Sequence, residues 1–153
     1  MNRSSDLGSK PEFRRAARLV VVDSRNRILL FQYARLSGEK FWATPGGGLE
    51  GGETFEEAAA REALEELGVR NTHLHVLCER TADFVFVDRQ VHQREMFFLV
   101  RVESLEFDEE VREVHRREGI LQACWWSLAE FSKSSEVIFP EDLAQILKSV
   151  MRG

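Results

Sequence analysis

Apolar and polar positions near the start of the chain predict a β-hairpin. Residues 16–22 and 28–33 are apolar and rich in β-branched and aromatic types, and the polar residues 23–26 between them favour a turn. Residues 72–87 and 91–102 repeat this pattern on either side of a short polar segment, which predicts a second hairpin.

Two segments carry signals for helix starts. Thr54 and Glu57 form a capping box, and residues 55–67 contain no Gly, Pro or β-branched residue before Gly68, so one helix is expected over this stretch. Ser127 and Glu130 form a second capping box.

A last helix is expected to start at Pro140, because Leu143, Ile146, Leu147 and Val150 fall on one face. Residues 103–119 carry mixed charges and predict an exposed loop with some helix. The elements together predict an α+β domain with a mostly antiparallel or mixed sheet. The length of 153 residues suits a single domain over residues 13–153, preceded by a loose polar tail over residues 1–12.

The amino-acid composition excludes some classes of binding partner. Acidic residues outnumber basic ones by 26 to 21, and the resulting net charge of -5 disfavours binding to a nucleic-acid polymer. The two cysteines, Cys78 and Cys124, form no metal-type pair, which fits reduced thiols in a cytoplasmic protein. No apolar run approaches the roughly 18 residues of a membrane span, so no membrane partner is expected.

Candidate chemistry lies in a glycine-rich segment and in the helix that follows it. Five glycines stand within residues 46–52, which predicts a bent and exposed backbone. On the helix, Glu62, Glu65 and Glu66 fall within an arc of roughly 100° and repel one another. A Mg²⁺ ion that also binds substrate phosphates would compensate their charge. The alternative is an acidic, solvated helix face.

The glycines also match the dinucleotide-binding pattern, as Gly46-x-Gly48-x-x-Gly51. That pattern requires a strand directly before the loop, whereas Pro45 interrupts the preceding strand and the upstream segments form a hairpin. Glu50 and Glu53 would also place negative charge near a bound pyrophosphate. This interpretation is therefore disfavoured.

The same residues resemble a known family motif. Gly47, five residues, Glu53, seven residues and then Arg61-Glu62-Ala63-x-Glu65-Glu66-x-Gly68-Val69 are similar to the complete Nudix box, here Gly47 to Val69, with the usual Pro45-Gly46-Gly47 before it. The resemblance implies an α/β/α sandwich with a mixed β-sheet between helices.

It also implies a Mg²⁺-dependent hydrolase, with Mn²⁺ as a possible substitute, that splits the pyrophosphate bond of a nucleoside diphosphate linked to another moiety. Carried over by position, Glu62, Glu65, Glu66 and the Gly46 carbonyl would be metal ligands. Arg61 and Glu53 would form a supporting pair. The resemblance further points to an acidic residue outside the box, and Glu118 is the candidate, with Glu110 and Glu113 as rivals.

The small-molecule substrate is less defined. Gly46, Gly47 and Gly48 are expected to contact it, and Trp42 and Phe84 are candidates to stack on it, although aromatic residues of this kind more often belong to a core. The family's subclass markers are absent at residues 84–86, which leaves a nucleoside triphosphate or a nucleotide sugar. A non-catalytic nucleotide sensor on the same fold is the alternative, and a homodimer stays open.

Overall fold

The computed structural model describes residues 10–70, 73–86 and 88–151. Within these residues one mixed sheet has the strand order β5-β6-β1-β2-β3-β8, while β4 pairs with β1 and β7 pairs with β2. The strands are β1 (Glu12–Val22), β2 (Ile28–Ala34), β3 (Lys40–Ala43), β4 (Gly46–Gly48), β5 (His75–Phe86), β6 (Arg89–Arg101), β7 (Gln122–Trp126) and β8 (Ile138–Phe139). The helices are α1 (Phe55–Glu62), the π-helical segment η1 (Ala63–Leu67), α2 (Glu109–Arg117), α3 (Leu128–Lys133) and α4 (Leu143–Val150).

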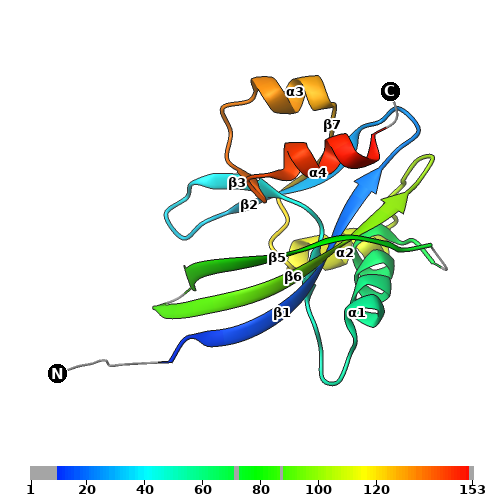
Figure 1. Cartoon of the computed structure of the whole chain (residues 1–153). Coiled ribbons are helices and arrows are strands. Elements are labelled where there is room, and N and C mark those ends of the chain that lie inside the picture. Colours follow the sequence, from blue (N-terminus) through cyan, green and yellow to red (C-terminus); the bar gives the residue numbers. More distant parts are fainter. Residues whose placement is uncertain (1–9, 71–72, 87, 152–153) are drawn as a thin grey trace.

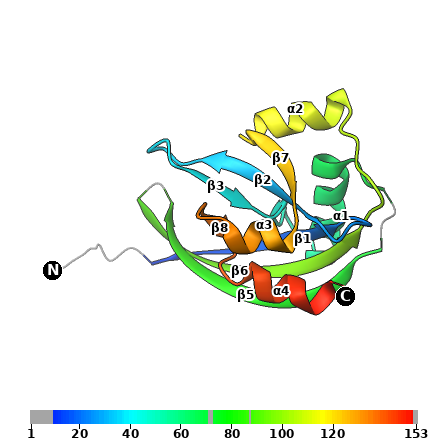
Figure 2. The same cartoon turned by 90° about the horizontal axis from the view of Figure 1, so that it is seen from above.

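Helices cover the sheet on both sides. Helices α1 and α2 lie against one face, and α3 and α4 lie against the other (Figures 1 and 2). Each face has its own apolar core, one with alanines of α1 and one with Leu143, Ile146 and Leu147 of α4. The expected α/β/α sandwich with a mixed sheet is confirmed.

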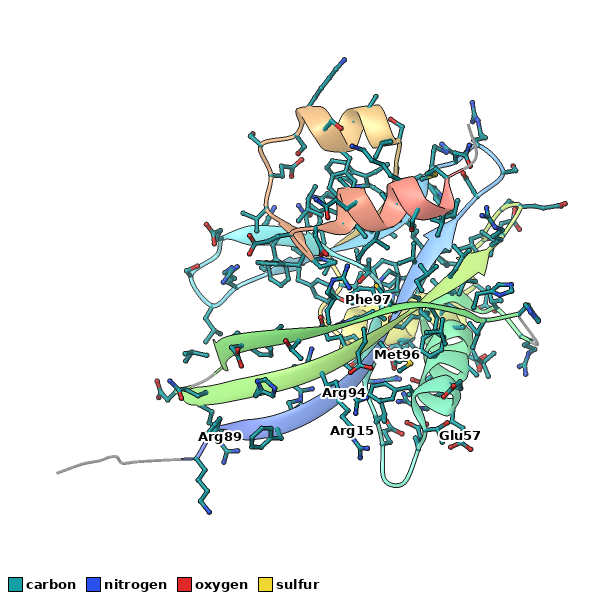
Figure 3. All side chains as sticks on the ribbon, in the orientation of Figure 1. Arg15, Glu57, Arg89, Arg94, Met96 and Phe97 are labelled. Carbon is teal, nitrogen blue, oxygen red and sulfur yellow. The ribbon has the colours of Figure 1, made fainter. Side chains whose placement is uncertain are left out.

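Side chains that alternate along the central strands β1 and β6 contribute to both apolar cores. Met96 of β6 packs against the core under α1, and its neighbour Phe97 belongs to the core under α4 (Figure 3). On β1, Leu19 and Val20 divide in the same way, because successive strand side chains point to opposite faces.

Both predicted hairpins are present. In the first one, the two strands pair only next to the turn and then pair with other strands. Val22 and Ile28 pair, and Asp23 Oδ1 accepts hydrogen bonds from the backbone N–H groups of Arg25 and Arg27. Along Glu12–Val22, β1 then pairs in parallel with β6, whereas β2 pairs with β3 and β7. The sheet therefore divides into two parts that meet at this turn.

Two predicted boundaries differ from the structure at the N-terminal end and in the glycine segment. Strand β1 begins at Glu12, inside the predicted tail, because it pairs with Val91 of β6. Residues 1–9 of that tail lie outside the described residues. The glycine backbone is not fully exposed, since Gly46 is buried and β4 pairs with residues 16–18 of β1.

The predicted helix over residues 55–67 consists of two kinds of helix. Helix α1 ends at Glu62 and η1 continues to Leu67, and Gly68 ends the element in the left-handed conformation as predicted. The second capping box starts α3. The last helix starts at Leu143, three residues after Pro140, whose carbonyl instead accepts a hydrogen bond from Leu143 N in a preceding turn. In the described part of the chain, no helix has the length and apolar character needed to cross a membrane.

Candidate active site

Glycine 46 brings the loop into contact with the acidic helix. Its φ of +130° is a conformation that favours glycine, and an added Cβ would stand 2.2 Å from the carbonyl oxygen of Ala17. The Gly46 N–H donates to Glu66 Oε1 at 3.0 Å, and this contact is buried. Close pairing of β4 with β1 therefore places the loop backbone directly on the Glu66 carboxylate.

Glycine 47 leaves room for a second carboxylate. A Cβ at this position would stand 3.0 Å from Glu62 Oε2 and 3.3 Å from Oε1. Among the described residues, Glu62 Oε2 is one of two buried side-chain polar atoms without a hydrogen-bond partner. Two buried carboxylates, those of Glu62 and Glu66, thus lie at the same glycine bend.

Burial of these carboxylates changes their proton affinity. Desolvation and the nearby Glu62 charge raise the pKa of Glu66 to about 8, against the lowering effects of the Gly46 hydrogen bond and of Arg18. Desolvation also raises the pKa of Glu62, which Arg61 opposes. The donor set of buried carboxylate oxygens, one of them without a partner, fits a hard divalent cation.

Glu65 does not join this pair directly. Its side chain is 46% exposed, and its Oε1 lies 3.2 Å from Arg61 Nη1, which also donates to Glu62 Oε1 at 2.8 Å. In the described ranges, no group of three or more His, Cys, Asp or Glu side chains is arranged to hold a metal ion. Glu65 thus shares Arg61 with Glu62, and its charge contributes to the raised pKa of Glu62, while its own side chain is exposed.

Arg61 ties the helix to the loop. Its Nε and Nη2 donate to the two carboxylate oxygens of Glu53 at 2.8 and 3.0 Å, and Nη2 also donates to the carbonyl of Gly48 at 2.9 Å. The hydrogen bond from Arg61 lowers the pKa of Glu53. The expected contact between Arg61 and Glu53 is present. The planar guanidinium group of Arg61 holds the loop at two points, the Glu53 carboxylate and the Gly48 carbonyl.

Glu118 lies within electrostatic reach of the buried pair. It is the exposed C-cap residue of α2, and its charge contributes to the raised pKa values of Glu62 and Glu66. Glu113 instead pairs with Arg116, which lowers the pKa of Glu113. Of these two acids, Glu118 is the better placed, although its catalytic role stays a prediction.

Three residues near the site are absent from the sequence-based predictions. Arg18 donates to Glu95 Oε2 at 3.1 Å and approaches the Gly46 carbonyl at 3.5 Å. Arg14 Nη2 lies 3.3 Å from the position of a Cβ at Gly48. Burial and the Glu66 charge hold the pKa of Tyr33 well above its usual value, so its hydroxyl stays protonated. Two arginines four residues apart in one strand are the signal that could have indicated this charged face.

The two aromatic candidates lie away from this bend. Trp42 is 4% exposed, packs edge-on against Trp126 in the core under α4, and donates from Nε1 to Glu136. The prediction that Trp42 stacks on substrate is therefore wrong, because its ring faces are buried in the core. Phe84 lines a cavity of about 440 Å³ together with Phe13 and His92, and its role in binding stays a prediction.

A curated protein matches about a third of this chain. An RNA pyrophosphohydrolase of Shewanella baltica is 46% identical over 52 residues, which is 34% of this chain and 30% of that protein. The chain thus matches less than a third of the length of this curated relative.

Solved structures cover nearly the whole chain. The crystal structure of the MutT NUDIX hydrolase from Burkholderia pseudomallei has a TM-score of 0.65 and 22% identity, covering 92% of this chain and 99% of that one. The E. coli dihydroneopterin triphosphate pyrophosphohydrolase has a TM-score of 0.62 and 21% identity, covering 92% and 97%. These similarities show the fold.

The family assignment comes from the whole domain. The model of the NUDIX domain matches residues 12–149, which begin at the first residue of β1 and end within α4. Its motif residues Glu62 and Glu66 are the carboxylates that meet at the glycine bend. The chain belongs to the NUDIX domain family.

Proposed function

We propose that this protein is a Mg²⁺-dependent pyrophosphohydrolase, which splits a nucleoside diphosphate linked to another moiety. The observation that carries the proposal is the buried Glu62–Glu66 pair at the glycine bend, in which Glu62 Oε2 lacks a hydrogen-bond partner. Two carboxylates in this position repel each other unless a proton or a cation compensates them. A divalent cation does so at neutral pH and remains available to substrate phosphates.

The metal ligands are proposed to be Glu62, Glu66 and, after release from Arg61, Glu65, with the Gly46 carbonyl as a further oxygen. When bound, the cation neutralises charge on the phosphate oxygens and makes water more acidic. Mn²⁺ is expected to replace Mg²⁺, because both accept carboxylate and carbonyl oxygens.

The chain's own residues have distinct roles in this proposal. Arg61 and Glu53 hold the loop against the helix. Arg14 and Arg18 bring positive charge to the glycine bend, where guanidinium groups bind phosphate oxygens. Glu118 is exposed and accepts the proton of the attacking water. Gly46, Gly47 and Gly48 are proposed to contact the diphosphate through their backbone.

The reaction class is supported by the names of two relatives. The Shewanella baltica and E. coli proteins are both named pyrophosphohydrolases, one for RNA and one for dihydroneopterin triphosphate. For this chain a nucleoside triphosphate or a nucleotide sugar is the proposed substrate class. The net charge of -5 argues against a long RNA, since its phosphates would be repelled.

A substrate panel tests this proposal. Nucleoside triphosphates, nucleotide sugars, ADP-ribose, dinucleoside polyphosphates and a 5′-triphosphate oligonucleotide are incubated with Mg²⁺, Mn²⁺ or EDTA, and released phosphate and pyrophosphate are measured. We expect hydrolysis with either metal and none with EDTA. Glu66→Gln should reduce kcat by about 100-fold or more, whereas Glu56→Gln, which changes an exposed glutamate of α1, should leave kcat unchanged.

Two outcomes contradict the proposal. Undiminished turnover in the Glu66→Gln variant would remove the proposed site. If no compound is split under any condition but nucleotides still bind, the protein is instead the non-catalytic sensor module.

A further inference from the structure

A buried histidine contacts the backbone of a proposed metal ligand. His115 of α2 lies with its Nε2 2.7 Å from the carbonyl oxygen of Glu66, and both residues are buried. A carbonyl oxygen only accepts hydrogen bonds, so Nε2 carries the proton and donates. The 49 positions that separate the two residues make this a tertiary link, and the resemblance to the Nudix box does not extend to it.

The Glu66 carbonyl needs a partner of this kind. It stands in the last turn of η1, where carbonyls have no partner within the helix. The carbonyls of Ala63 and Leu64 accept hydrogen bonds from the backbone N–H groups of Val69 and Gly68. His115 supplies the corresponding donor for Glu66, and thereby fixes the backbone that carries the buried carboxylate.

Aromatic side chains hold the His115 ring in place. Its centroid lies 4.9 Å from the Phe31 ring and 4.8 Å from the Phe107 ring. Close contact of α2 with the end of η1 also depends on Gly68, because a Cβ there would stand 3.2 Å from Val111 Cγ2. Helix α2 therefore packs closely against η1, and Figure 2 shows α2 next to the helical segment that begins with α1.

The same residue orders the turn that carries Glu118. The His115 carbonyl accepts a hydrogen bond from Ile120 N at 2.9 Å, and Glu118 N donates to the Val114 carbonyl. The side chain of His115 thus holds the end of η1, while its backbone holds the turn at Glu118. His115 thus makes hydrogen bonds both to the backbone of Glu66 and to the turn that contains Glu118.

We infer that His115 is a positioning residue, whose hydrogen bond to the Glu66 carbonyl holds the Glu66 and Glu118 carboxylates in their working arrangement. The inference rests on the proposed hydrolase function. Groups in this indirect position around a metal site typically change metal affinity or activity by 10- to 100-fold when they are lost.

Two substitutions separate the donor from the ring. His115→Phe keeps an aromatic ring between Phe31 and Phe107 but removes the donor. His115→Gln removes the ring but keeps an amide nitrogen four bonds from Cα, as in histidine. His75→Phe, at an exposed position on β5, is the matched control. The readouts are Mn²⁺ affinity by calorimetry, kcat and KM for the substrate found in the panel, and thermal unfolding.

For His115→Phe we expect a Mn²⁺ affinity and a kcat lowered roughly 10- to 100-fold, with a much smaller change in KM. His115→Gln should recover most of both losses, and His75→Phe should match the wild type. Equal behaviour of the Phe and Gln variants in affinity and kcat overturns the inference, even if both unfold at lower temperature. If the wild type binds Mn²⁺ but hydrolyses nothing, the proposed function fails, and the affinity series still decides the role of His115.

Discussion

At the scale of single residues, the main feature of the site is a pair of buried carboxylates whose negative charges are only partly compensated. Glu62 and Glu66 are buried next to each other, and the hydrogen bonds from Arg61 and Gly46 compensate them only in part, as their raised pKa values indicate. A proton relieves the remaining repulsion in the metal-free protein, and the proposed cation would relieve it in the loaded protein.

This conflict predicts how stability depends on pH. The pKa of Glu66 is about 8 in the folded protein, against an ordinary value of 4.5, so the folded state binds more protons than the unfolded state between these two values. The free energy of unfolding of the metal-free protein should therefore fall as the pH rises from about 4.5 through about 8. Urea unfolding in EDTA across this range measures it.

The Glu66→Gln variant is the control for this pH dependence. Its amide cannot ionise, so the decline should become much shallower. Saturating Mg²⁺ should also flatten the decline in the wild type, since it compensates the ionised form. An unchanged slope in Glu66→Gln would show that another group causes the dependence.

At the scale of elements, the glycine bend fits against the helix with little spare room. The sequence indicates both the glycine segment and the acidic helix, because Thr54, Glu57 and Gly68 are strong local signals. It does not indicate that the helix changes to π-helical winding after Glu62. The sequence also does not indicate that the side chain of Glu65 is exposed while those of Glu62 and Glu66 are buried.

Glycine substitutions test the fit of this bend. Gly47→Ala should push the Glu62 carboxylate by a few tenths of an ångström and lower kcat roughly tenfold, since a displacement of about 1 Å costs roughly 100-fold. Gly51→Ala is the matched control, because its Cβ meets nothing within 4 Å. Steady-state kinetics of the two variants measure the difference. Equal kcat values would show that the Glu62 position does not matter.

At the scale of the whole molecule, Trp42 belongs to the core under α4, whereas the candidate site lies at the glycine bend against α1 and η1. The hairpins, the capping boxes and the fold class are predictable from alternation and local signals. The role of Trp42 is not, because an aromatic residue before a glycine segment looks the same in a sequence whether it faces a pocket or a core. The role of His115 is not predictable either, since its contact depends on how α2 meets η1, whereas the spacing of Arg14 and Arg18 in one strand does offer a signal.

The position of Trp42 in the core leads to a separate prediction about stability and substrate binding. Trp42→Phe removes the hydrogen bond to Glu136 and part of the packing against Trp126, and should lower the free energy of unfolding by about 1–3 kcal/mol. Because the ring lies in the core under α4, KM should stay unchanged. Chemical unfolding and substrate saturation curves check both parts. A raised KM with unchanged stability would return Trp42 to the substrate site.

Mn²⁺ binding measured by electron paramagnetic resonance tests the central claim most directly, because free Mn²⁺ gives a signal that weakens on binding. The wild type and the Glu62→Gln/Glu66→Gln double variant are titrated at neutral pH, after thermal unfolding has shown that both are folded. We predict that the wild type binds Mn²⁺, that Mg²⁺ competes for the site, and that the double variant has lost this binding. Equal Mn²⁺ binding by the two proteins would contradict the claim that the buried glutamate pair is the metal site.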